Sequence, residues 1–386
     1  MLNFNFYNPT HILFGKGRIA DLNQQIPADA KVMLLYGGGS IKKNGVFEQV
    51  MAALGNRSVT EFTGIEPNPS YETLMQAVEI IRKGHIDFLL AVGGGSVIDG
   101  TKFIAAAALF EGAEPWAILE KRGSNITRAL PFGSVLTLPA TGSEMNSGGV
   151  VTRKSIKAKM AFSSPHCFPK FSVLDPLTTY TLPVRQVGNG AVDAFVHVME
   201  QYLTYPVNSP VQDRFAESLL LTLIEEGPKA LINPEDYDVR ANLMWCATMA
   251  LNGLIATGVP QDWATHMIGH ELTALHGIDH AQTLAIILPS MMRVRKLSKR
   301  AKLLQYAERV WNLRDGDEDT RIDAAIAKTQ DFFEQMGVKT RLRDYSVDAS
   351  HVPAVLAALS EHRMIALGEQ REVTLEVSRA VLELSL

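Results

Sequence analysis

The stretch DFLLAVGGGSVID at residues 87–99 decides the fold more than any other part of the chain. It begins as a short apolar run of the kind found in buried strands, and the glycines end that strand. Glycine lets the backbone approach a ligand closely, and Ser96 is placed to cap a following helix, with Asp99 completing a capping box. A helix end of this kind suits a pyrophosphate, although a tight turn with an ordinary cap fits the same residues.

Two more apolar runs of this type lie in the first half of the chain. Residues 31–36 read KVMLLY and precede GGGS at 37–40, and residues 134–139 read SVLTLP and precede ATGSE at 140–144. Between them, residues 71–82 place their apolar positions on one helical face. Strands that alternate with helices predict a parallel sheet covered on both sides. No GxGxxG follows a strand, so the standard dinucleotide fingerprint is absent.

The second half of the chain has a different pattern. From about Arg185 onward, segments with a helical period dominate, and Leu182-Pro183 interrupts the chain just before them. The clearest helical segments are 240–256, 301–311, 322–336 and 352–361. The sequence therefore predicts an α/β domain with a Rossmann-like parallel sheet over residues 1–183 and an all-helical domain over residues 184–386.

Composition excludes several classes of protein. The chain has 386 residues, 46% hydrophobic and 20% charged, with a net charge of −4, so it lacks the basic field that attracts nucleic acid or anionic membranes. Two isolated cysteines, Cys167 and Cys246, indicate a reducing compartment. The N-terminal residues MLNFNF lack the basic start of a signal peptide, and no run of 18 apolar residues occurs. We expect a soluble cytoplasmic protein with no membrane or nucleic-acid partner.

The N-terminal residues 2–6 alternate between apolar and asparagine side chains. This alternation predicts a strand with one apolar face, whose edge is suited to pairing two copies of the chain. We therefore expect a homodimer.

Histidines gather in the helical half. Asp193 and His197 are four residues apart, as are His266 and His270, and as are His276 and His280, and residues at this spacing share a helix face. Carboxylate and imidazole ligands together suit a divalent ion such as Zn²⁺ or Fe²⁺. Met267 follows His266, so the HExxH pattern of zinc peptidases is absent.

The turn GGGSIKK at residues 37–43 bears on the choice of cofactor. A dinucleotide that lies along the ends of the strands places its adenosine end near such a turn. The turn offers glycine amides, the Ser40 hydroxyl, Lys42 and Lys43, but no acidic residue to bind a free 2′-hydroxyl. These donors favour NADP over NAD.

Together these motifs resemble the iron-containing (group III) alcohol dehydrogenase family over nearly the whole chain. The resemblance rests on GGGSVID at 93–99, PATGSE at 139–144 and the spacing of the Asp193 and histidine positions. Residues 258–266 and 269–274 are most similar to the bacterial NADPH-dependent aldehyde reductase and butanol dehydrogenase branch. Asp279 and Ala281 flank His280 where the broader family usually has proline and glycine.

The resemblance implies roles for particular residues. It implies a metal, iron or zinc, held by Asp193, His197, His266 and His280. His270 then lines the substrate pocket without binding the metal and is the candidate for proton transfer, whereas His276 matches no ligand position. The implied cofactor contacts are Gly38, Gly39, Ser40, Gly94, Gly95, Ser96, Asp99, Thr137, Thr141, Asn146, Lys159, Leu177 and Thr181.

The activity that follows is hydride transfer between NADPH and small aldehydes, with the metal polarising the carbonyl oxygen. Three alternatives remain open at this point. One is a lyase similar to dehydroquinate synthase, whose fold also pairs a dinucleotide with a divalent metal but turns over no net cofactor. The others are an NAD-linked polyol dehydrogenase of the glycerol type and a protein that binds metal or nucleotide without catalysis.

Overall fold

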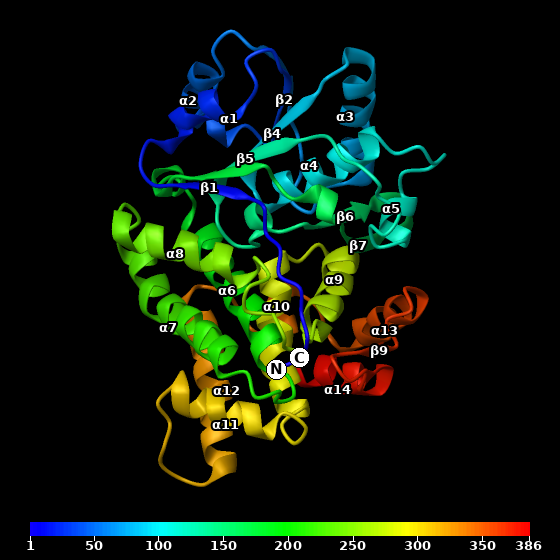
Figure 1. Cartoon of the computed structure of the whole chain (residues 1–386). Helices are drawn as coiled ribbons and strands as arrows, with labels where there is room; N and C mark the ends of the chain where they lie inside the picture. Colours follow the sequence, from blue (N-terminus) through cyan, green and yellow to red (C-terminus); the bar gives the residue numbers. More distant parts are fainter. The chain divides into compact units, whose positions relative to one another are not determined.

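A computed structural model describes all 386 residues, and the chain forms two compact units. The sheet unit comprises Tyr7–Leu182 and Glu235–Thr248. The helical unit comprises Met1–Phe6, Pro183–Pro234 and Met249–Leu386 (Figure 1). A boundary after residue 183 between independently folding domains stays a prediction.

The sheet unit is built on a parallel sheet of six strands in the order β1-β8-β5-β4-β2-β3. This arrangement confirms the parallel α/β sheet expected from the sequence. The chain passes from β2 outward to β3 and then returns to β4 on the other side of β2, so the strand order reverses between β2 and β4. The strands are β1 (His11–Phe14), β2 (Lys31–Tyr36), β3 (Ser58–Phe62), β4 (Phe88–Gly94), β5 (Phe132–Leu138) and β8 (Phe171–Leu174).

Each face of the sheet buries its own hydrophobic core. Met33 and Leu35 of β2 pack with the apolar residues of α3 (Tyr71–Gly84) and α4 (Gly95–Ala108). Val32 and Leu34, which alternate with them, pack with α1 (Leu22–Gln25) and α2 (Val46–Leu54) on the other face. Because both faces are covered, the strands carry continuous apolar runs, as the sequence pattern indicated.

The sheet unit also contains elements that the sequence analysis did not predict. An antiparallel hairpin is formed by β6 (Gly148–Arg153) and β7 (Ala158–Ser163). The short helix α5 (Ala117–Glu120) and most of α8 (Tyr237–Ala250) also belong to this unit. The hairpin follows the loop after β5 and contributes Lys159 to the same unit.

The helical unit confirms the change of pattern near Arg185. Its α10 packs against both α6 and α9, which brings three histidine-bearing helices together. A second core joins α9 and α10 to the C-terminal helices. The helices are α6 (Val184–Tyr202), α7 (Pro210–Ile232), α9 (Ala264–His276), α10 (His280–Val294), α11 (Arg300–Arg309), α12 (Glu318–Gln335), α13 (Val352–Glu361) and α14 (Leu375–Leu384), with one small sheet of β9 (Ala366–Leu367) and β10 (Val373–Thr374).

Two local expectations are wrong. Residues 1–10 contain no strand, and the first strand begins at His11, so the alternation of Leu2, Phe4 and Phe6 does not correspond to a strand in this chain. The helix expected over 240–256 ends at Ala250, and the residues after it form turns and bends that include Gly253 with φ 91°.

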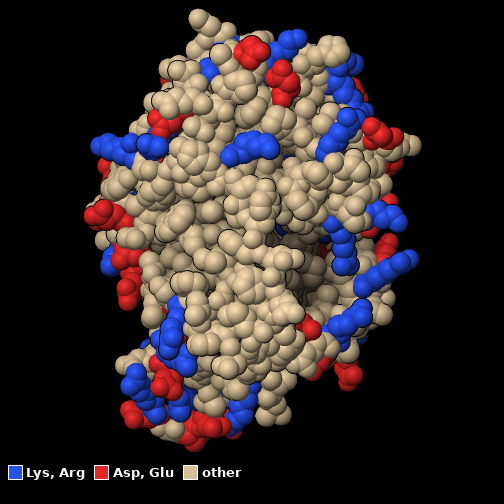
Figure 2. All heavy atoms as spheres, in the orientation of Figure 1, with Lys and Arg blue, Asp and Glu red and all other residues tan.

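Surface charge follows the nearly neutral composition. Figure 2 shows lysine and arginine interspersed with aspartate and glutamate on the face in view, without a large patch of one sign. None of the helices is both long and apolar enough to span a membrane.

Candidate active site

The two glycine turns come together because their strands are neighbours. β2 and β4 are parallel and paired from Val32 opposite Phe88 to Tyr36 opposite Val92, so their carboxyl ends meet at one edge of the sheet. In open α/β sheets, ligands bind at this edge where the strand order reverses. The GGGS turns at 37–40 and 93–96 therefore lie at the place where the fold favours a dinucleotide.

The turn after β2 leaves room for a ligand. Gly39 has φ 85°, and no atom lies within 4 Å of where a Cβ would be at Gly38 or Gly39. Ser40 is exposed at the start of a 3-10 turn that runs to Lys42. The space and the amide groups at this turn agree with the predicted adenosine end of the cofactor cleft.

Lys42 has a partner that the sequence did not reveal. Its ammonium lies 2.7 Å from the carboxylate of Glu61, which also accepts a hydrogen bond of 2.6 Å from the Tyr36 hydroxyl. These contacts hold the pKa of Glu61 below its usual value. An acidic residue is thus present beside this turn after all, on β3, and its charge is balanced by Lys42.

The turn after β4 is closely packed, and only glycine fits it. A Cβ at Gly93 would lie 2.6 Å from Val97 Cγ2, and one at Gly94 would lie 2.9 Å from Leu138 Cβ. A Cβ at Gly95 would lie 2.4 Å from Thr141 Oγ1. The missing side chains let α4 begin directly against the loop after β5.

Ser96 does not cap α4, contrary to the sequence prediction. The helix begins at Gly95, two residues before the start that a cap at Ser96 would give, with Gly94 as its N-cap and no side-chain hydrogen bond at the cap. Ser96 Oγ instead accepts a hydrogen bond of 3.3 Å from the backbone amide of Asn68. The glycine run continues into the helix, so the capping box expected from Ser96 and Asp99 does not form.

Both carboxylate oxygens of Asp99 accept hydrogen bonds from other residues of the sheet unit. Ser143 Oγ donates to one of its carboxylate oxygens at 2.5 Å, and the Val150 amide donates to the other at 2.9 Å. Lys102, fully buried, donates to Ser143 Oγ, to Asn146 Oδ1 and to the Gly148 carbonyl at 2.6–2.8 Å. Burial lowers the pKa of Lys102 to about 8 and raises that of Asp99. This network fixes the loop after β5 against α4.

The other predicted cofactor residues lie in the same unit. Lys159 is buried on β7, and its ammonium donates to Asn68 Oδ1 at 2.8 Å, so Asn68 links it to Ser96. Thr181 Oγ1 accepts from the Asn44 amide at 3.1 Å, which ties it to the loop after β2. Thr137 lies near the end of β5, and Leu177 lies in a 3-10 turn after β8. Their contact with a cofactor stays a prediction.

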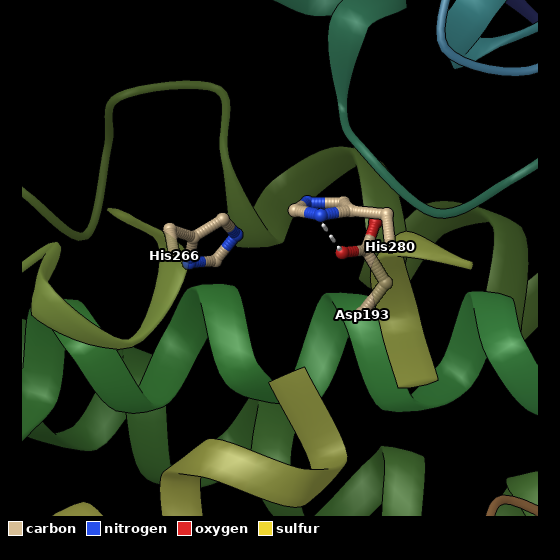
Figure 3. A group of neighbouring side chains, drawn as sticks. All are labelled: Asp193, His266 and His280. Carbon is tan, nitrogen blue, oxygen red and sulfur yellow. Dashed lines mark ion pairs between the residues drawn. The ribbon is translucent and has the colours of Figure 1, made fainter. Parts of the chain in front are cut away.

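The metal candidates converge within the helical unit. Asp193 of α6, His266 of α9 and His280 of α10 each offer an atom that lies within 4.8 Å of the other two (Figure 3). His280 Nε2 lies 3.6 Å from Asp193 Oδ1. Asp193 and His266 are 3% and 5% exposed. One carboxylate and two imidazoles at this separation fit a divalent transition metal.

His197 lies beside this group without being part of it. Its ring centre is 4.6 Å from that of His266, and its Nδ1 is buried without a hydrogen bond, 3.8 Å from Asp193 Oδ2. Burial lowers the pKa of His197 to about 4, although Asp193 partly opposes the shift. A neutral ring keeps a lone pair for a metal, so the residue fits the fourth ligand position that the family resemblance implies.

The two remaining histidines of this region have different surroundings. His270 is 3% exposed, and its ring centre lies 5.2 Å from that of His280. His276 is at the end of α9, where its ring meets His351 at 4.9 Å. The structure therefore places His270 next to the candidate ligands and His276 against a surface histidine outside the group.

Sequence reasoning missed Glu200, Asn68 and Glu61. Glu200 contacts the His266 ring, and burial raises its pKa well above the usual value. Its place seven residues after Asp193 on the same helix was a usable signal, because Asp193, His197 and Glu200 then share one helical face. No local signal pointed to Asn68 or Glu61, whose partners are distant in sequence.

These features define a class of protein, in which an α/β unit with dinucleotide-type glycine turns is joined to a helical unit with a buried Asp–His cluster. Models of the iron-containing alcohol dehydrogenase match residues 9–176, and models of the C-terminal part of the Fe-containing alcohol dehydrogenase family match residues 188–384. The chain belongs to the iron-containing alcohol dehydrogenase family.

Named relatives extend over almost the whole chain. It is 64% identical to the NADPH-dependent aldehyde reductase YqhD of Escherichia coli over 99% of both chains. It is 43% identical to the probable NADH-dependent butanol dehydrogenase 1 of Bacillus subtilis over 92% of both. The crystal structure of E. coli YqhD superposes with a TM-score of 0.99 at 63% identity, covering 100% of this chain and 99% of that one. The NADH-dependent butanol dehydrogenase A of Thermotoga maritima gives a TM-score of 0.95 at 35% identity, covering 100% and 99%.

Proposed function

We propose that this chain is a metal-dependent, NADPH-linked reductase of small aldehydes, which also oxidises the corresponding alcohols. The observation that carries the proposal is the group of Asp193, His266 and the partly exposed His280, whose ligand atoms lie within 4.8 Å of one another. It occurs in a chain that is 64% identical to an aldehyde reductase.

We infer that Asp193, His197, His266 and His280 hold one divalent ion, iron or zinc. When bound, such an ion supplies Lewis-acid polarisation of a carbonyl oxygen, and NADPH supplies a hydride. The donors are nitrogen and oxygen atoms only, a set that both ions accept. The burial of Asp193, His197 and His266 limits competition by water for their donor atoms.

His270 is our candidate for proton transfer. Reduction of an aldehyde turns its carbonyl oxygen into an alkoxide, which takes up a proton to give the alcohol. His270 lies one helical turn from His266 and beside His280, so a ring nitrogen of this residue is close to the atoms that would hold the substrate oxygen. In the direction of alcohol oxidation the same nitrogen would accept the proton.

For the cofactor, we propose that the turn after β2 binds a 2′-phosphate. The amides of Gly38 and Gly39 and the Ser40 hydroxyl are donors, as a phosphate requires. Lys42 neutralises Glu61, so the neighbouring carboxylate does not repel the phosphate. The relatives named above include NADPH- and NADH-dependent proteins, which makes the cofactor ratio a direct test.

The test combines kinetics with elemental analysis of the purified protein. NADPH oxidation should depend on added aldehyde across a series of chain lengths, and kcat/KM should be higher with NADPH than with NADH. Metal content should approach one ion per chain, and removal of the metal should abolish turnover. Metal and NADPH binding without net NADPH oxidation by any aldehyde would contradict the proposal and favour a lyase or a non-catalytic protein. We also propose that the protein is a homodimer and that it is cytoplasmic. Light scattering in solution would measure the mass of the dimer.

A further inference from the structure

Glu200 lies on the same face of α6 as the metal candidates Asp193 and His197. Asp193, His197 and Glu200 are spaced by four and then three residues, so they lie on one face of the helix over two turns. The Glu200 side chain is 3% exposed. A buried carboxylate is costly unless polar partners satisfy it, so its partners indicate its role.

The partners of Glu200 all belong to the start of α9. One carboxylate oxygen accepts a hydrogen bond of 2.7 Å from the Thr265 amide, and the other contacts Nδ1 of the His266 ring. The Glu200 carbonyl also accepts from the Asp262 amide at 2.9 Å. Glu200 therefore holds both the backbone of this segment and the imidazole that projects from it.

The contact with Nδ1 has a chemical consequence for the ring. A neutral imidazole carries its proton on one nitrogen and a lone pair on the other. An ionised carboxylate at Nδ1 selects the tautomer with the proton there, which leaves the lone pair on Nε2. It also fixes the plane of the ring and makes the Nε2 lone pair a stronger electron-pair donor to a metal. Burial raises the pKa of Glu200, and the hydrogen bond from the Thr265 amide opposes this shift by favouring the ionised form.

We propose that Glu200 is a positioning residue that sets the tautomer and orientation of His266 for metal binding. The inference rests on the metal site of the proposed function, but its readouts are metal affinity and ring protonation rather than aldehyde turnover. The proposed enzyme activity can therefore fail while this inference stands, and the reverse also holds.

A simpler role for Glu200 would be to cap α9, since the Thr265 amide is one of the first N–H groups of that helix. Asp262 performs such a role nearby, because its side chain accepts from the Ala264 amide at 2.9 Å and pairs with Lys299. The Asp262 side chain bonds to Ala264 and Lys299, so Asp262→Asn is a control that weakens the same helix start and leaves the Glu200 side chain in place against His266.

The variant Glu200→Gln separates the two roles. Its amide oxygen can still accept from Thr265, but its NH₂ group facing Nδ1 favours the tautomer with the proton on Nε2. We expect the Kd for Co²⁺, measured by competition with a chromophoric chelator, to rise roughly 10–100-fold. The visible bands of the cobalt protein should change as well. Asp262→Asn should keep the Kd for Co²⁺ and the intensity of the visible bands within about twofold of the unmodified protein. The two proteins are compared at temperatures at which they are equally stable. A cobalt affinity that is unchanged in folded Glu200→Gln would overturn the proposal.

A second measurement needs no variant. Long-range ¹H–¹⁵N correlation of histidine-labelled full-length protein, measured before any metal is added, reports which nitrogen of each ring carries the proton. We expect His266 to carry it on Nδ1. A proton on Nε2 would refute the inference even if Glu200→Gln failed to fold.

Discussion

Replacing Gly95 with alanine tests whether the turn after β4 depends on a missing side chain. The added Cβ would lie 2.4 Å from Thr141 Oγ1 and 2.7 Å from its Cγ2. Carbon atoms in contact are normally about 3.5–4.0 Å apart, so α4 or the loop carrying Thr141 must shift by roughly an ångström. Overpacking of this kind costs about 1–3 kcal/mol, and the better helix propensity of alanine offsets at most about 1 kcal/mol. We expect a net loss of up to about 3 kcal/mol in the free energy of unfolding.

Two further variants make the result specific. Gly38→Ala is the control, because no atom lies within 4 Å of its added Cβ, and it should change stability by no more than about 0.5 kcal/mol. Thr141→Gly removes the crowded atoms, so the double variant with Gly95→Ala should be more stable than the sum of the single changes by about 1–3 kcal/mol.

Urea unfolding followed by circular dichroism gives the stabilities, and fluorescence titration with NADPH gives Kd. The displaced helix start should weaken NADPH binding in Gly95→Ala, because the amides at this helix end are the predicted phosphate donors. If Gly95→Ala matches Gly38→Ala in stability, or if the double variant shows no coupling, the packing argument for this turn is wrong.

The other predictions concern single residues. His280→Ala should lose the bound metal, whereas His276→Ala, whose ring meets His351 outside the ligand group, should keep it in elemental analysis; the reverse pattern would disprove our ligand assignment. His270→Ala should keep the metal and lower kcat roughly 10²-fold, and loss of stoichiometric metal would instead identify a ligand. Gly39→Asp should reverse the preference for NADPH by at least about tenfold in kcat/KM ratio, because its carboxylate repels a 2′-phosphate and no atom lies within 4 Å of the added Cβ. The φ of 85° strains any side chain at this position, and Gly39→Asn carries the same strain. Gly39→Asn, without the charge, should not reverse the preference, and equal behaviour of the two variants would remove the electrostatic explanation. The pKa of Lys102 falls to about 8 in the folded protein from 10.5, so the unfolded chain binds more protons between these values and stability should rise with pH there. Lys102→Met should lose that rise in urea midpoints measured between pH 8 and 10, and an identical pH slope in both proteins would contradict the shifted pKa.

The sequence alone predicted the elements whose evidence is local. The apolar run at 31–36 became β2 with the same bounds, and the helical face at 71–82 became α3, which Ser70 caps at its start. The spacing of four between His266 and His270 correctly indicated one helix. These predictions succeed because the period of a helix or strand can be recognised from residues that are neighbours in the sequence. The hairpin β6–β7 was missed because its pairing partners lack such a strong period.

Only the tertiary structure decided which distant residues meet. Glu61 reaches Lys42 because β3 pairs with β2, and Glu200 reaches His266 because α6 and the start of α9 lie together. A sequence pattern specifies which side chains share one face of a helix or strand. It does not specify which other helix or strand packs against that face. The sequence therefore determined the classes of donor in this protein, the glycine amides, the carboxylate and the imidazoles. The packing of strands and helices determined their partners, their burial and hence their protonation, because these depend on contacts between residues far apart in the chain.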